Sequence, residues 1–186
     1  IKGLFDNLKP TGSEVFDSYI DHVLNIYKQF YSYDTIPLKD WSKNYIPFTA
    51  YSYGLFERYS DSIDKKDCRT QIYHGKYAET FIQKNLSNGI TVELVFLFRD
   101  WGCAALIKTW DTKSGYRILC KRTEEIRRLC AKNINICWNN KQLKNRIKIA
   151  KKEITVETPY VAFNAWIEDC VKDYLDYAQK IESVPK

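Results

Sequence analysis

Hydrophobic positions near the start of the chain recur with the spacing of a helix. Between residues 13 and 32 apolar side chains return every three or four positions, and acidic and polar residues occupy the opposite side. This periodicity predicts an amphipathic helix over about 13–32. Thr11 and Glu14 have the spacing of a capping box, in which the threonine caps the helix and the glutamate reaches back. Two prolines then predict a loop, followed by a second, shorter helix within 49–63.

The middle of the chain changes to a β-type pattern. Segments 71–85 and 89–98 are rich in β-branched and aromatic residues, and Asn88-Gly89 at their junction is a strong hairpin signal. Shorter segments with β-type patterns follow, separated by turn-like polar runs. Together they predict an antiparallel meander of five or six strands over 67–157. Segment 123–132 within it fits a helix as well as a strand.

The end of the chain returns to helical spacing. A wide apolar stripe runs along a predicted helix over 158–186, with Thr158 as its cap and Pro159 in its first turn. Such a stripe has to be buried, and the sheet offers the surface for it. The sequence therefore predicts a single α+β domain over 1–186. Its parts are an N-terminal helix or helix pair with loops over 1–66, the β-meander over 67–157, and a C-terminal amphipathic helix packed on the sheet over 158–186.

Six cysteines and no methionine stand out in the composition. An even number of cysteines, dispersed over the last two-thirds of the chain, is typical of a secreted domain with three disulfides. We therefore expect a disulfide-stabilised, secreted, extracellular protein, either a mature chain or an excerpt, with Asn85 as a glycosylation acceptor. A cytosolic protein with buried thiols is the alternative. The preferred pairings are Cys103 with Cys120, Cys130 with Cys137, and Cys68 with Cys170, and other pairings stay open.

Charge is distributed unevenly along the chain. Residues 113–152 contain thirteen Lys or Arg against two acids, whereas the remainder has sixteen basic and twenty-one acidic residues. Where strand alternation holds, one face of the sheet is basic and the other is core. A basic sheet face fits an anionic macromolecule such as a sulfated glycan, an acidic protein or a lipid surface. The alternative is a solvated face that keeps the protein soluble. The candidate anion-binding residues are Arg117, Arg127, Arg128, Lys144, Arg146 and Lys148.

Two aromatic-rich segments fit a small-molecule site. The tyrosines of 45–59 suit a wall for an apolar or aromatic ligand, with hydroxyls that orient it. The alternative is a tyrosine-rich core beneath a loop. In 96–110 two charged residues separate two apolar runs, either as an exposed turn or as the edge of a binding mouth, and Gly102 permits a bend there. The candidate ligand-binding residues are Tyr45, Tyr51, Tyr53, Arg99, Asp100 and Trp101.

The sequence offers no motif for a catalytic centre or a metal site. The closest cysteines are seven positions apart, and His22 and His74 belong to different predicted elements, so the spacing of a zinc site is absent. Cys103 needs a base such as His74 to act as a nucleophile. We therefore expect no cofactor, no metal, no transmembrane segment and a non-catalytic binding protein. The alternatives are a secreted hydrolase or nuclease that uses carboxylates and His74, and an intracellular nucleic-acid-binding protein.

Overall fold

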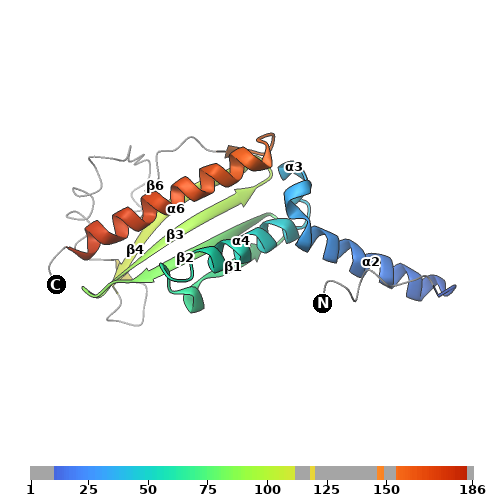
Figure 1. The fold of residues 1–186 in the computed structure, drawn as a ribbon, viewed down its shortest axis with the longest axis horizontal. Helices are drawn as coiled ribbons and strands as arrows, with labels where there is room; N and C mark the ends of the chain where they lie inside the picture. Colours follow the sequence, from blue (N-terminus) through green and yellow to red (C-terminus); the bar gives the residue numbers. More distant parts are fainter. Residues whose placement is uncertain (1–10, 112–117, 120–145, 149–153, 184–186) are drawn as a thin grey trace.

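Helices come first and last in the chain and the sheet lies between them, so the predicted α+β class is confirmed (Figure 1). The computed structural model describes residues 11–111, 118–119, 146–148 and 154–183. The helices are α2 (Glu14–Tyr31), α3 (Leu38–Trp41), α4 (Ile46–Arg58) and α6 (Tyr160–Glu182), with 3-10 turns η1 (Tyr33–Thr35) and η2 (Lys65–Asp67). The strands are β1 (Arg69–Tyr73), β2 (Tyr77–Asn85), β3 (Ile90–Arg99), β4 (Gly102–Asp111), β5 (Ile118–Leu119), β6 (Arg146–Lys148) and β7 (Ile154–Thr155).

The sheet is antiparallel, and consecutive strands from β1 to β5 are neighbours. The predicted meander is confirmed along this path. The remaining two strands depart from it, because β6 and β7 both pair with β4. The region expected to form one strand after residue 144 therefore contributes two short strands. The ambiguous segment 123–132 lies outside the described residues.

Hairpin turns set the register of the longest strands. Asn88-Gly89 connects β2 to β3 as predicted, and Gly89 has a φ of 81°. A second hairpin divides segment 71–85, which the sequence does not resolve into two strands. At its turn His74 and Gly75 both have positive φ, 51° and 67°. This conformation is typical of a tight turn between antiparallel strands, and it places His74 at the tip rather than within a strand.

Both predicted helix caps are wrong in detail. At the start of α2 the N-cap is Ser13, and Thr11 donates hydrogen bonds to Asp17 from its amide and its hydroxyl, at 2.6 and 2.9 Å. Gly12, at a φ of 85°, turns the chain so that Asp17 can reach back. At the start of α6 the N-cap is Pro159, and the hydroxyl of Thr158 lies 3.4 Å from that of Thr155. The bodies of both helices agree with the predicted ranges.

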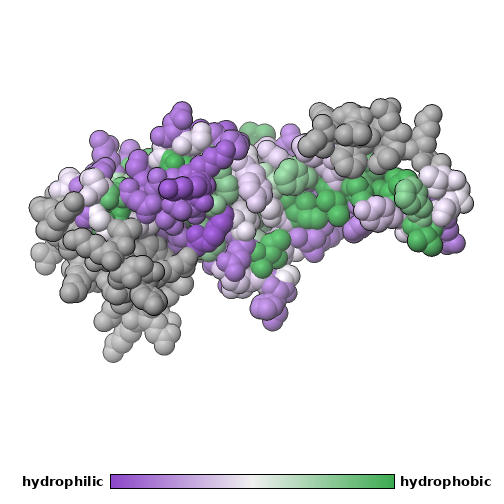
Figure 2. Space-filling view, turned by 90° about the horizontal axis from the view of Figure 1, so that it is seen from below, coloured by the Kyte–Doolittle hydropathy of each residue, from purple (hydrophilic) through white to green (hydrophobic). Residues whose placement is uncertain are grey.

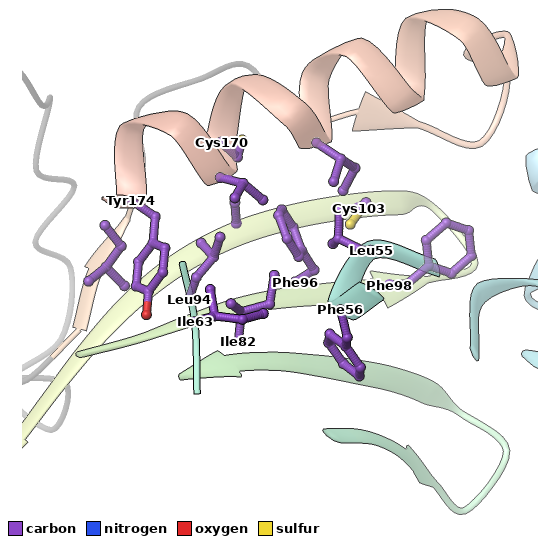
Figure 3. Close-up of a cluster of buried hydrophobic side chains, with 14 of the residues drawn as sticks. Leu55, Phe56, Ile63, Ile82, Leu94, Phe96, Phe98, Cys103, Cys170 and Tyr174 are labelled. Carbon is purple, nitrogen blue, oxygen red and sulfur yellow. The ribbon is translucent and has the colours of Figure 1, made fainter. Parts of the chain in front are cut away.

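One face of the sheet, the helical face, carries the core. Alternate residues of β2, β3 and β4 share this face, and α4 and α6 cover it with their apolar sides. Figure 3 shows the cluster, in which Leu94, Phe96 and Phe98 of β3 lie beneath α6 and near Leu55 of α4. Phe98 stacks on Phe48 of α4 with ring centroids 4.9 Å apart. The stripe of α6 is therefore buried on the sheet, as its spacing predicts.

Polar side chains join α4 to α6 at the rim of this core. Arg58 forms an ion pair with Glu168 at 2.9 Å, and the hydroxyl of Tyr59 donates to the same carboxylate. Burial and the bond to Glu168 raise the pKa of Tyr59 to about 12. The hydroxyl of Tyr51 donates to Asn164 at 2.9 Å. These contacts fix how the two helices lie against each other, because a buried hydrogen bond is directional and apolar packing is not.

Helix α2 points away from the sheet and displays apolar residues (Figure 1). Its second half is tied to the body by the Asn44 side chain, which donates to Gln29 at 2.6 Å. In its first half Val15, Phe16 and Tyr19 are 84%, 51% and 62% exposed. Figure 2 shows hydrophobic residues along this projecting part of the molecule. The apolar spacing that predicts α2 therefore does not predict its burial along the whole length.

Gly102 allows β7 to approach β4. It has a φ of 142°, and a Cβ atom there would lie 1.8 Å from the carbonyl oxygen of Ile154. The sequence predicts that Gly102 permits a bend, and the structure shows that it permits a close approach of two strands. The glycine is needed where the backbone of one strand lies almost against another. Val156 then donates its amide to the carbonyl of Trp101 at 3.2 Å and continues this contact.

We expect Gly102→Ala to lower the free energy of unfolding by roughly 3 kcal/mol, because the added methyl group meets rigid backbone. Chemical denaturation measures this change, and hydrogen exchange at Val156 reports the loss of the β4–β7 contact. Gly54→Ala in α4 is the matched control, since its Cβ would meet the hydroxyl of Tyr33 at an ordinary 3.5 Å. That variant should be as stable as wild type or slightly more stable. Equal effects of the two substitutions would contradict this role for Gly102.

Candidate functional site: the charged second face of the sheet

The sheet face opposite the helices carries buried charge. We call it the second face, and it comprises the alternate residues that do not face α4 and α6. Its members with described side chains are Arg69, Gln71, Tyr73, Tyr77, Glu79, Phe81, Gln83, Asn85, Thr91, Glu93, Val95, Leu97, Arg99, Ala104, Leu106 and Lys108. Glu93 is 0% and Lys108 5% exposed. Acidic and basic side chains are rarely this buried unless they are paired, so this face is chemically unusual.

Two cations and one carboxylate meet around the ring of Phe81. The guanidinium of Arg69 lies 4.1 Å from the centre of the ring, and the ammonium of Lys108 lies 5.1 Å from it. Arg69 also forms an ion pair with Glu93 at 3.3 Å, and Glu93 is the register partner of Lys108. The second oxygen of Glu93, Oε2, is buried without a hydrogen-bond partner. The cluster thus places two cations and one carboxylate together on the second face.

The backbone of β6 pairs with β4 beside this cluster. Arg146 is the register partner of Lys108, and Lys148 is the partner of Leu106, both residues of the second face. The structure therefore brings two of the six candidate anion-binding residues beside the buried cluster. Arg117, Arg127, Arg128 and Lys144 lie outside the described residues, so their assignment stays a prediction.

A stack of three planar groups occupies the end of the second face near the β1–β2 turn. The rings of Tyr73 and Tyr77 are stacked with centroids 4.7 Å apart and planes inclined by 19°. The guanidinium of Arg99 lies over the ring of Tyr77 at 4.8 Å. Its Nε atom is buried without a hydrogen-bond partner. Packing of this kind fixes the plane of the guanidinium.

The candidate ligand-binding residues do not form one wall. Tyr45 and Tyr51 are 2% and 1% exposed and belong to the core, which favours the alternative of a tyrosine-rich core. Tyr53 is 53% exposed on α4 and packs its ring against Phe56. Asp100 and Trp101 form the exposed turn between β3 and β4.

Tyr45 does approach the β3–β4 turn. It is the N-cap of α4 in a left-handed conformation, with a φ of 60°, which few residues other than glycine adopt. Burial raises the pKa of its phenol; the charge of Asp100 adds to this effect and that of Arg99 opposes it. The structure thus brings Tyr45, Arg99 and Asp100 into one neighbourhood.

A shallow cleft lies elsewhere, between the η1–α3 segment and the start of α6. It measures about 280 Å³ and is lined by residues 34–39 and 156–160. This volume is small for a ligand pocket, and none of the six candidate ligand-binding residues lines it. This cleft therefore does not support the predicted small-ligand wall.

The described cysteines do not support a catalytic thiol. Cys103 is completely buried on the helical face (Figure 3), and burial raises the pKa of its thiol well above the ordinary value, an effect to which the nearby Cys170 adds. His74 lies exposed at the β1–β2 turn. Cys68 and Cys103 are thiols in the structure, so the disulfides expected between Cys68 and Cys170 and between Cys103 and Cys120 are not shown. Cys120, Cys130 and Cys137 lie outside the described residues.

Asn85 ends β2 and is exposed, but its side chain is engaged. Its amide donates to Asp67 at 3.2 Å, and its carbonyl oxygen accepts from the hydroxyl of Thr91 at 2.8 Å. Glycosylation at this residue stays a prediction.

Comparisons with protein-family models, curated proteins and solved structures find no significant match. Within the part of the chain that the structure describes, no helix is long and apolar enough to cross a membrane. The same residues contain no group of three or more His, Cys, Asp or Glu placed to hold a metal ion. The function must therefore be argued from the second face itself.

Sequence reasoning missed the centre of this face. Arg69, Glu93 and Lys108 were not among the candidates, because Glu93 and Lys108 each stand alone in an apolar segment and Arg69 follows a short run of mixed charges. A charged residue at the middle of an apolar strand is the available signal. It becomes meaningful only when the register shows that Glu93 and Lys108 are opposite each other.

We expect Glu93→Gln to lower the free energy of unfolding by roughly 2 kcal/mol, because Arg69 loses its ion-pair partner while the shape is kept. Urea denaturation at neutral pH measures this change. Glu79→Gln on the same face is the matched control, since Glu79 is only half-buried, and it should change stability by less than about 0.5 kcal/mol. A Glu93→Gln variant as stable as wild type would show that the buried carboxylate does not balance the cluster.

Proposed function

We propose that this chain is a secreted, non-catalytic binding protein that docks an anionic macromolecule, a sulfated glycan, through the basic segment 113–152 and the partly exposed end of the second face at Arg99. The observation that carries the proposal is the register of β6. It joins segment 113–152, with thirteen basic and two acidic residues, to the sheet beside the buried cation Lys108. Opposite charge on a ligand is the simplest way to balance such an excess.

The other side of the molecule supports this assignment. Helix α6, which covers the helical face, contains five acidic and two basic residues between Tyr160 and Glu182. The two sides of the sheet therefore differ in sign, and this difference gives a polyanion one preferred side for approach. Electrostatic attraction of this kind favours encounter in a defined orientation.

Secretion and disulfides are the sequence-based part of the proposal. They rest on the six cysteines and on the Asn85-Leu86-Ser87 acceptor. Sulfated glycans are abundant outside cells, so a secreted chain with a basic face favours this class of polyanion over nucleic acid.

We expect the purified, unreduced protein to show no reactive thiol after denaturation, since three disulfides would consume all six cysteines. Thiol titration in denaturant measures this number, and the reduced protein serves as the control with six. Six thiols without reduction would contradict the secreted, disulfide-stabilised form.

We expect the protein to bind heparin, and Arg146→Glu with Lys148→Glu to weaken binding roughly tenfold near 0.15 M salt. The dependence of log Kd on log salt should also become shallower, as fewer counterions are released. Fluorescence anisotropy with a labelled heparin oligosaccharide measures both quantities.

The matched control is Lys39→Glu with Lys172→Glu, which makes the same change in net charge at exposed sites away from the second face. It should leave binding within about threefold of wild type. Equal losses in the two double variants would show that net charge alone attracts heparin. Binding to phosphatidylserine vesicles but not to heparin would overturn the glycan in favour of a lipid surface.

A further inference from the structure

Arg99 lacks an anionic partner among the described residues. Three arginines have described side chains. Arg58 is paired with Glu168 and Arg69 with Glu93. Arg99 forms no ion pair with any described residue, and this includes Asp100, the next residue in the sequence. Its Nε atom is also one of four buried side-chain polar atoms without a hydrogen-bond partner in the described part of the chain.

An unpartnered guanidinium is costly to bury, because each lost hydrogen bond to water has to be replaced. Arg99 is only partly exposed, so solvent does not fully replace these bonds. Buried polar groups of folded proteins nearly always have partners, and each exception needs an explanation, one of which is a bound ion that supplies the partner. The position of Arg99 therefore calls for an acceptor from outside the described residues.

The stack holds this cation ready for a planar or tetrahedral anion. Tyr77 supports one face of the guanidinium at 4.8 Å, and Tyr73 supports Tyr77 at 4.7 Å. A guanidinium fixed in this way loses little conformational entropy when it binds, and its fork of N–H donors matches sulfate or carboxylate oxygens. The stacked rings add a flat surface of the kind that can lie against the face of a sugar.

We propose that Arg99, held on Tyr77 and Tyr73, is an anion subsite that binds a sulfate or carboxylate group of an acidic sugar. This inference deepens the proposed function and rests on it for the identity of the glycan. Arg99 and Lys108 belong to the same second face.

We expect Arg99→Lys to weaken heparin binding about threefold to tenfold, since lysine keeps the charge but loses the fork and the stacking. Tyr77→Leu should weaken it in the same direction by removing the support, whereas Tyr77→Phe should bind like wild type. Arg58→Lys is the matched control away from the second face, because Arg58 lies on α4 and is already paired with Glu168, and it should bind within about twofold of wild type.

A second measurement does not depend on the glycan. Sodium sulfate, titrated against sodium chloride of equal ionic strength, should shift the ¹⁵N–¹H signal of the Arg99 side-chain Nε–H in a saturable way. Arg99→Lys removes that signal and identifies it. The same titration with free glucuronate tests a carboxylate, so the two anion chemistries are distinguished.

The outcomes separate this inference from the proposed function. If the Arg146/Lys148 double variant loses heparin binding while Arg99→Lys keeps it, the subsite is wrong and the proposed function stands. If sulfate titrates Arg99 but heparin does not bind, the subsite stands and the glycan proposal fails. Failure of both measurements overturns both. An equal loss of heparin binding in Arg58→Lys and Arg99→Lys also overturns the subsite, since it would show that the loss does not depend on the position of the arginine.

Discussion

The burial of one apolar sheet face under two helices is the constraint on which the rest of the structure depends. Side chains alternate along a strand, so every residue placed toward α4 and α6 commits its neighbours to the opposite side. Phe96 and Phe98 on the helical face require Leu97 and Arg99 on the second face, and Leu94 requires Glu93. The charged second face is therefore a consequence of the register that fills the core. A slip of one residue would exchange the two faces and bury Arg99 under the helices.

The sequence was sufficient to predict the elements that have a regular apolar spacing or a clear turn signal. The body of α2, the Asn88-Gly89 hairpin and the stripe of α6 follow from spacing alone, because each is stabilised locally or by a single large interface. The helix caps were less predictable. Thr11 and Glu14 match a capping box, but the positive φ of Gly12 brings Asp17 to the amide of Thr11 instead. Which side chain accepts the hydrogen bonds at the start of this helix depends on a single backbone angle, and the residue pattern does not determine that angle.

The site was less predictable than the fold, for a physical reason. Tyrosine is equally suited to a core and to a ligand wall, since its ring is apolar and its hydroxyl needs only one partner. In Tyr51 that partner is Asn164 of α6, more than a hundred residues later in the chain. The contacts of Glu93 likewise come from β1 and β4. Residues whose role depends on long-range pairing give no local signal, so the aromatic segment was recognisable but its burial was not.

The three arginines with described side chains show how differently one residue type is treated in this fold. Arg58 lies at the rim between two helices, where Glu168 and two tyrosines surround it, and it fixes the geometry of the core. The guanidinium of Arg69 lies over the ring of Phe81 and forms an ion pair with the buried carboxylate of Glu93, which neutralises the charge of Arg69. Arg99 has the aromatic support, but no carboxylate of the described residues forms an ion pair with it. Packing on tyrosine fixes the position of a cation without cancelling its charge, whereas an ion pair does both. A cation that is held in place but left charged is suited to recognising an anion, and the alternation of β3 places it on the same face as the buried cluster.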